Sequence, residues 1–188
     1  MVNGERDGMG IMIYDAGRIY EGNWKNDKRN GKGYEIYENR NIYDGDFVKG
    51  KAEGYGYFYW NNGDTFEGIF KNGLKQGYGA FKGEITYIGE WMESKPEGKG
   101  VCILKNGSKL EGFWKNGLEH GHFTETNKFG EMFEMEYDLG VRVKTKNEIK
   151  LDNDRESINV IEKDKNLNNS GNNLNKINDF TKINHERK

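Results

Sequence analysis

Five carboxylates recur along the chain at intervals of 23, 23, 44 and 23 residues and form a candidate acidic ladder: Glu21, Asp44, Glu67, Glu111 and Glu134. Carboxylates perform acid–base chemistry when two of them lie close together in environments that separate their pKa values. One acid in every second strand of a sheet leaves about 10 Å between neighbours, so little coupling is expected. We therefore expect a solvated ladder that pairs with Lys or Arg side chains on adjacent strands, with binding of a cation or a basic partner as the alternative.

Other residues that could bind a metal or act as a nucleophile are few. Glu119, His120 and His122 stand close together, but zinc needs three or four converging ligands and nothing else nearby supplies them. Cys102 is expected to be a small residue in a strand rather than a reactive thiol. Repeated Gly-x-Gly pairs are not followed by a helix or by Lys-Ser/Thr, so they do not indicate a nucleotide-binding loop. We expect no catalytic, metal or cofactor site, and no enzyme activity.

A repeated unit explains the spacing better than a reaction centre does. Triplets of a ring or Leu, an acid or Ile, and a glycine start 23, 23, 21 and 23 residues apart. They begin at Tyr20, Tyr43, Phe66, Tyr87 and Leu110. A further ring stands two residues after each glycine, and Gly-x-Gly pairs follow in step at Gly31/Gly33, Gly54/Gly56, Gly77/Gly79 and Gly98/Gly100. After residue 120 the pattern decays, since Phe123 replaces the second glycine of the pair.

Alternation within each triplet predicts a β-strand with a ring-glycine-ring face. In the first copy, Tyr20, Gly22 and Trp24 share one face and Glu21 the other. A recurrent strand glycine marks a close approach, so we expect a ring from the neighbouring repeat to lie over its bare Cα. The predicted structural core is Tyr20, Gly22, Trp24, Tyr43, Gly45, Phe47, Phe66, Gly68, Phe70, Tyr87, Gly89, Trp91, Leu110, Gly112 and Trp114. A second strand and a tight turn complete each hairpin.

One spacing is shorter than the others, between Gly79 and Tyr87, where two residues are missing. Because strand side chains alternate between faces, loss of an even number keeps every ring on its own side. The shorter spacing is therefore compatible with one continuous register.

Composition fits a small core of rings. The chain has 188 residues, of which 34% are hydrophobic and 13% aromatic, and its mean hydropathy is −1.02. A single cysteine excludes an internal disulfide and fits a reducing compartment. No run of residues approaches the length of a membrane span, and the first ten residues have no apolar core of a secretory signal. We expect a cytoplasmic protein.

The residues 20–33, YEGNWKNDKRNGKG, resemble the MORN (membrane occupation and recognition nexus) repeat, with Asp27 where the repeat has a glycine. Residues 66–79 and 110–121 keep that glycine, as Gly73 and Gly117. The resemblance implies an all-β fold: an elongated, single-layer, open antiparallel sheet of stacked hairpins that binds lipids or proteins. Stacked units that contact only their neighbours form such a solenoid.

The predicted organisation is a repeat array over residues 1–137 and a capping hairpin strand over 138–146. An Asn/Lys-rich, low-complexity tail, disordered or weakly helical, follows over 147–188. Within the array we expect a half repeat (4–18), five repeats (19–41, 42–64, 65–85, 86–108 and 109–131) and a degenerate copy (132–137). Val141 and Val143 in the cap are expected to face inward.

Six-residue windows after the second ring of each copy are expected to be loops that make one edge of the array basic. Its candidate residues for an anionic lipid or a partner are Lys25, Lys28, Arg29, Lys49, Lys51, Lys71 and Lys75. Anionic headgroups attract such an edge, although a merely solvated edge is the simpler interpretation. Nucleic acid is not an expected partner, because the rest of residues 1–140 is acidic.

The leading hypothesis is a non-enzymatic scaffold for protein partners. The resemblance adds cytoskeletal or membrane-associated assemblies as its setting. An anionic-membrane or phosphoinositide-binding module is one alternative, and the regulatory repeat region of an enzyme with its catalytic domain elsewhere is another. An unpaired first strand would also favour a homodimer through strand pairing.

Overall fold

The computed structural model describes residues 4–143, and the chain divides into two units between Glu93 and Ser94. The predicted tail at 147–188, its weak helix and the last residues of the cap lie outside the described residues. Each unit is treated by itself below.

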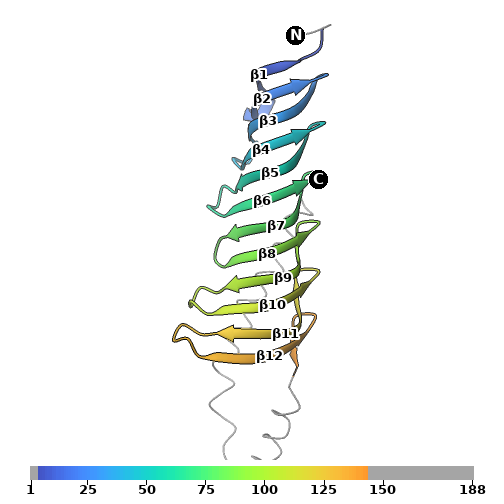
Figure 1. Ribbon diagram of the computed structural model, residues 1–188. Helices are drawn as coiled ribbons and strands as arrows, with labels where there is room; N and C mark the ends of the chain where they lie inside the picture. Colours follow the sequence, from blue (N-terminus) through green and yellow to red (C-terminus); the bar gives the residue numbers. More distant parts are fainter. Residues whose placement is uncertain (1–3, 144–188) are drawn as a thin grey trace, which may run out of the picture. The chain divides into compact units, whose positions relative to one another are not determined.

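The first unit is an antiparallel sheet whose strands follow one another in chain order (Figure 1). Its strands are β1 (Gly8–Ile13), β2 (Ile19–Lys25), β3 (Lys28–Ile36), β4 (Ile42–Val48), β5 (Lys51–Tyr59), β6 (Thr65–Lys71), β7 (Leu74–Lys82) and β8 (Thr86–Met92). A 3₁₀ turn at Asp15–Gly17 joins β1 to β2. The second unit continues the pattern with β9 (Lys95–Ile103), β10 (Lys109–Lys115), β11 (Leu118–Thr126), β12 (Met132–Asp138) and β13 (Val141–Val143). The predicted all-β fold of hairpins in an open, single-layer antiparallel sheet is confirmed.

Two-residue turns close the hairpins. In the β6–β7 turn both residues have positive φ, 53° at Asn72 and 85° at Gly73, which is the geometry of a type I′ turn. Asp27 occupies the glycine position of the β2–β3 turn at φ 60°, and Arg6 Nε binds its Oδ1 at 2.8 Å. The six-residue windows are therefore mostly strand rather than loop, and the prediction of loops there was wrong.

The two glycines of each Gly-x-Gly pair serve different purposes. The first glycine has positive φ, as in Gly31 (90°) and Gly54 (71°). It lies at a β-bulge, where a nine-residue strand, β3 or β5, pairs with a seven-residue strand, β2 or β4. The second leaves room for a ring: a Cβ on Gly56 would lie 2.6 Å from the hydroxyl oxygen of Tyr43.

The ring that covers each pair of glycines belongs to the same hairpin, not to a neighbouring repeat as predicted. Tyr20 covers both Gly22 and Gly33, and its hydroxyl donates to the Asn23 carbonyl at 2.8 Å. Neighbouring repeats meet through the second ring instead. The Tyr20 ring makes edge contacts with the rings of Trp24 at 5.0 Å and Phe47 at 5.2 Å.

Register is kept across the shortened turn, as predicted. Gly79 pairs with Gly89 and Phe81 with Tyr87, and both rings stay buried. At the far end, β12 and β13 form a hairpin, but Val141 and Val143 are exposed. The expectation that these valines face inward was wrong, because the register places them opposite Asp138 and Glu136, on the other side of the sheet from the buried Tyr137.

Candidate binding surfaces

The face that carries the predicted acids, called here the outer face, alternates carboxylates with tyrosines in the first unit. One residue from each strand aligns across the sheet in the order Ile11, Glu21, Tyr34, Asp44, Tyr57 and Glu67. The acids therefore lie opposite tyrosines, not opposite Lys or Arg as predicted. In the second unit Glu111 and Glu134 both lie opposite Thr124.

Apolar side chains continue this face on both sides of the acid–tyrosine row. Strand β5 alone exposes Tyr55, Tyr57 and Tyr59, with exposed fractions of 45%, 37% and 41%. Another row aligns Ile13, Ile19, Ile36, Ile42 and Tyr59. Sequence reasoning did not single these residues out, although the alternation of three tyrosines in YGYFY was the available signal.

Hydrogen bonds hold a charge at the centre of this face. Tyr55 and Tyr57 both donate to Oε1 of Glu67, the latter at 2.9 Å. The bond from Tyr55 is the main reason why the pKa of Glu67 is lowered. This carboxylate therefore stays ionised beside exposed rings.

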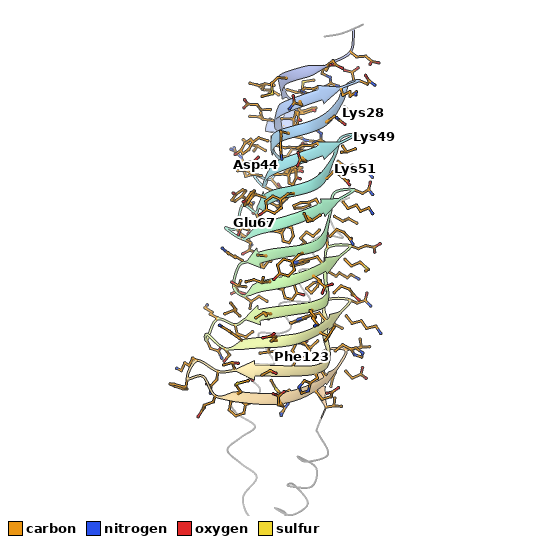
Figure 2. All side chains as sticks on the ribbon, in the orientation of Figure 1. Lys28, Asp44, Lys49, Lys51, Glu67 and Phe123 are labelled. Atoms are coloured by element: carbon orange, nitrogen blue, oxygen red, sulfur yellow. The ribbon has the colours of Figure 1, made fainter. Side chains whose placement is uncertain are left out.

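The basic edge is real but smaller than predicted. Five exposed lysines, Lys25, Lys28, Lys49, Lys51 and Lys71, lie next to the turns. Figure 2 shows Lys28, Lys49 and Lys51 at one end of the strands, away from Asp44 and Glu67.

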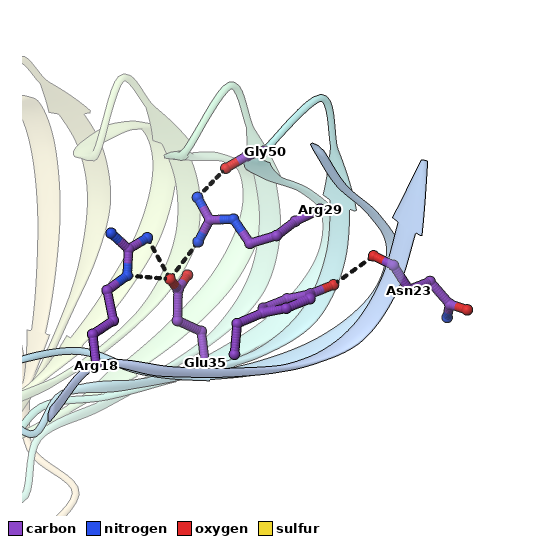
Figure 3. Close-up of polar contacts among 6 residues, drawn as sticks. Arg18, Asn23, Arg29, Glu35 and Gly50 are labelled. Carbon is purple, nitrogen blue, oxygen red and sulfur yellow. Dashed lines mark hydrogen bonds and ion pairs between the residues drawn. The ribbon is translucent and has the colours of Figure 1, made fainter. Parts of the chain in front are cut away.

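Arg29 and Lys75 do not belong to that edge, because both project onto the inner face with the core rings. Arg29 and Arg18 converge on Oε1 of the fully buried Glu35, and Arg29 also donates to the carbonyl oxygen of Gly50 (Figure 3). Lys75 is only 4% exposed, and burial lowers its pKa to about 7. Including these two residues in a lipid-binding edge was wrong.

The residues considered for metal or thiol chemistry do not form one site. His122 Nε2 lies 2.6 Å from Glu134 Oε2, and His120 Nδ1 lies 3.4 Å from Asp138 Oδ1. Cys102 is buried, and burial raises its pKa to about 12. Between residues 4 and 143 no group of three or more His, Cys, Asp or Glu side chains is arranged to hold a metal. The same residues contain no helix with the length and apolar character to cross a membrane.

Glu119 is the unexpected titratable group. Its side chain is 3% exposed, its Oε1 atom has no hydrogen-bond partner within residues 4–143, and burial raises its pKa to about 7. It lies opposite Trp114 on the inner face of the second unit, where Ala52 and Lys75 lie in earlier repeats.

Comparison with protein families finds the MORN repeat at residues 1–17, 20–42, 43–65, 66–84, 87–109 and 111–122. No curated protein matches the chain. Among solved structures, the chain is similar to the SAS-4 (dCPAP) TCP domain of Drosophila melanogaster, described in complex with a proline-rich motif of Ana2 (dSTIL). The TM-score is 0.43 at 16% identity, and the match covers 67% of this chain and 70% of that one.

Proposed function

Because the chain belongs to the MORN-repeat family, we propose that it is a non-enzymatic scaffold that binds a protein partner on the outer face of its first unit. The observation that carries the proposal is the surface of tyrosines and isoleucines around acidic side chains, among them Glu67, which Tyr55 and Tyr57 hold by hydrogen bonds. Repeats of this family serve generally for binding, and most of the rings on the opposite face are buried in the core.

The chemistry of this face suits a protein better than a small molecule. Tyr is enriched in protein interfaces because it offers a large, rigid contact area together with a polar tip. Contiguous exposed apolar surface rimmed by polar groups commonly marks an interaction site. The central tyrosines are partly exposed, so they are free to contact a partner without unfolding the sheet.

A capture experiment with a matched control tests the proposal. The full chain is compared with a variant carrying Tyr55→Ser, Tyr57→Ser and Tyr59→Ser, and with a control carrying Lys28→Ser, Lys49→Ser and Lys71→Ser. Proteins retained from lysate are quantified by mass spectrometry after the melting temperatures have been matched. We expect the tyrosine variant to lose at least one partner that the lysine control retains. Equal retention by all three chains would reject the outer face as the binding surface.

The lysine edge supports a second candidate function, binding to an anionic membrane surface. Five exposed lysines next to the turns of one unit give the electrostatic attraction that such binding needs. Acids on the outer face oppose it, so protein binding remains the proposal that we favour. Residence in the cytoplasm, with the cytoskeleton or a membrane, remains a prediction.

A further inference from the structure

A cavity of about 210 Å³ opens on the inner face of the first unit. Ala52 forms part of its wall, and five aromatic residues form another part. Its lining residues are Arg29, Glu35, Tyr37, Tyr43, Phe47, Gly50, Lys51, Ala52, Phe58, Phe70, Asn72 and Gly73. None of these belongs to the outer face described above.

The cavity exists because one repeat lacks a long side chain that its neighbours possess. Arg29, Ala52 and Lys75 occupy the same position in successive hairpins, each opposite the second ring of its repeat: Trp24, Phe47 and Phe70. Arg29 and Lys75 project over the first ring of their own repeats, Tyr20 and Phe66. Ala52 ends at its β-carbon, so the corresponding space above Tyr43 stays open.

The environment of Lys75 shows what that space is built to hold. Its ammonium nitrogen lies 4.4 to 5.9 Å from the centres of four rings: Trp60, Phe66, Phe81 and Trp91. Cations within about 6 Å of a ring centre are attracted by the ring quadrupole. A four-ring cage around a lysine side-chain nitrogen is therefore already present in this protein, and its burial lowers the pKa of Lys75 to about 7.

The same cage recurs one repeat earlier, around Ala52. The residues at the equivalent positions are Tyr37, Tyr43, Phe58 and Phe70, and all four line the cavity. We call these four residues the Ala52 cage.

Distances between ring centres agree between the two cages. Tyr43 and Phe70 lie 5.0 Å apart at 82°, and the equivalent Phe66 and Trp91 lie 5.2 Å apart at 82°. Tyr37 and Phe58 lie 5.9 Å apart at 33°, and Trp60 and Phe81 lie 5.7 Å apart at 62°, so this pair keeps its distance but differs in tilt. The cage is thus formed without a side chain inside it.

A buried acceptor also faces the cavity. Glu35 binds both arginines through Oε1, whereas its buried Oε2 has no hydrogen-bond partner within the described residues. Lys51 is exposed, and Arg29 is already held by Glu35 and Gly50. A donor group entering the cavity therefore meets the Glu35 carboxylate, beside the Tyr37 hydroxyl, as well as four rings.

We propose that the Ala52 cage binds an alkylammonium group, supplied by a lysine side chain of a protein partner. The guest provides from outside what Lys75 provides from within the chain one repeat later. That a protein partner supplies the guest rests on the scaffold role in the proposed function, although the cage lies on the opposite face of the sheet from the outer-face site. The cage itself does not rest on it, because a free amine tests it directly.

Calorimetry with the full chain provides the test. Four probes are compared: n-butylammonium, and three otherwise identical short peptides carrying lysine, trimethyllysine or norleucine. Norleucine matches the apolar stem of lysine without its charge. We expect the two charged peptides to bind roughly five- to thirtyfold more tightly than the norleucine peptide, the ratio typical of a desolvated cation–π contact. Equal binding of norleucine would show an apolar pocket and overturn the proposal, as would no binding of any probe.

Two kinds of variant locate the binding. Ala52→Lys and Ala52→Met each fill the cavity from within the chain and should abolish binding of the charged probes, while Tyr37→Leu removes one ring and should weaken it several-fold. Phe113→Leu, which alters an exposed ring of the second unit, is the matched control and should change nothing. Unchanged binding by the Ala52 and Tyr37 variants would overturn the site. If n-butylammonium binds and the lysine peptide does not, the cage is supported but a partner's lysine is rejected as its guest. That result would not bear on the outer-face proposal.

Discussion

The tip of the Phe66 ring lies above Gly68 two residues further along the same strand. A Cβ built on Gly68 would come 2.8 Å from Phe66 Cζ and 2.7 Å from the Cα of Gly79 on the adjacent strand. The ring therefore rests on backbone at both glycines, and neither neighbour is the end of a flexible side chain that could move aside.

Gly68→Val should destabilise the first unit by about 1–3 kcal/mol, because the added branch forces the ring or the paired strand outward. The expected result is a lower midpoint in thermal and urea unfolding. Gly10→Ala is the control, since a Cβ there would lie 3.6 Å from Trp24, an ordinary contact distance. If Gly68→Val melts with the unaltered protein, the ring does not rest on this glycine in solution.

Much of this packing could be predicted from sequence, because each ring-glycine-ring triplet is a local pattern with the period of a strand. Which ring covers which glycine could not be predicted. The pattern places one ring two residues away in the same strand and another in the next repeat, and it does not distinguish between them. Repeat five shows the difficulty: Phe123 replaces a glycine and Leu110 replaces a ring. The buried Phe123, labelled in Figure 2, covers Gly112 from the opposite strand, where a Cβ would lie 2.5 Å from its ring. What looks like decay of the repeat is an exchange of the two roles.

Glu35→Phe should destabilise the first unit by about 2–4 kcal/mol, because Arg29 then loses its buried carboxylate. Adding Arg29→Ala removes the more buried of the two charges that lose their partner, leaves only the more exposed Arg18, and places Ala and Phe where the next repeat has Ala52 and Phe58. We therefore expect the double variant to be more stable than Glu35→Phe alone.

The measurement for this pair is a double-mutant cycle in urea. A coupling energy of at least about 1 kcal/mol between the two positions is expected for residues in direct contact. Additive losses would mean that the ion pair does not stabilise the sheet.

Glu119 should make the second unit less stable as pH rises from about 5 to 8. Its pKa is raised to about 7 by burial, whereas an unfolded Glu titrates near ~4.3. Between these values the folded state binds the extra proton, so the free energy of unfolding falls with rising pH, by up to about 3 kcal/mol for this group. Glu119→Gln should remove the dependence.

Hydrogen exchange of the β10, β11 and β12 amides at pH 5 to 8 measures this effect locally. A local probe is needed because Lys75 in the first unit has the opposite sign. Its pKa is lowered to about 7, so its contribution to stability increases above pH 7. Equal pH dependence in Glu119→Gln and the unaltered chain would contradict the assignment.

Burial of Arg29 and Lys75 could not be predicted because both stand in stretches that look like polar loops. Counting alternate residues from the turn also fails there, since the bulge at Gly31 or Gly77 interrupts the period of two. Outer-face tyrosines were missed for a different reason: the exposed Tyr57 and the fully buried Tyr43 have the same letter in the sequence, and only the register places them on opposite faces.

The lysine edge should not by itself bind membranes strongly. Each basic side chain near an anionic bilayer contributes about 1 kcal/mol, and Arg29 and Lys75 are not available to add to the five exposed lysines. Acids of the outer face oppose the same attraction.

We expect the chain to remain in the supernatant when it is sedimented with phosphoinositide-containing vesicles at physiological salt, where the Debye length is about 8 Å. A variant with Lys25, Lys28, Lys49, Lys51 and Lys71 changed to Glu should behave identically. Sedimentation of the unaltered chain that weakens with salt and is lost in this variant would make membrane binding the primary function and the protein-scaffold proposal secondary.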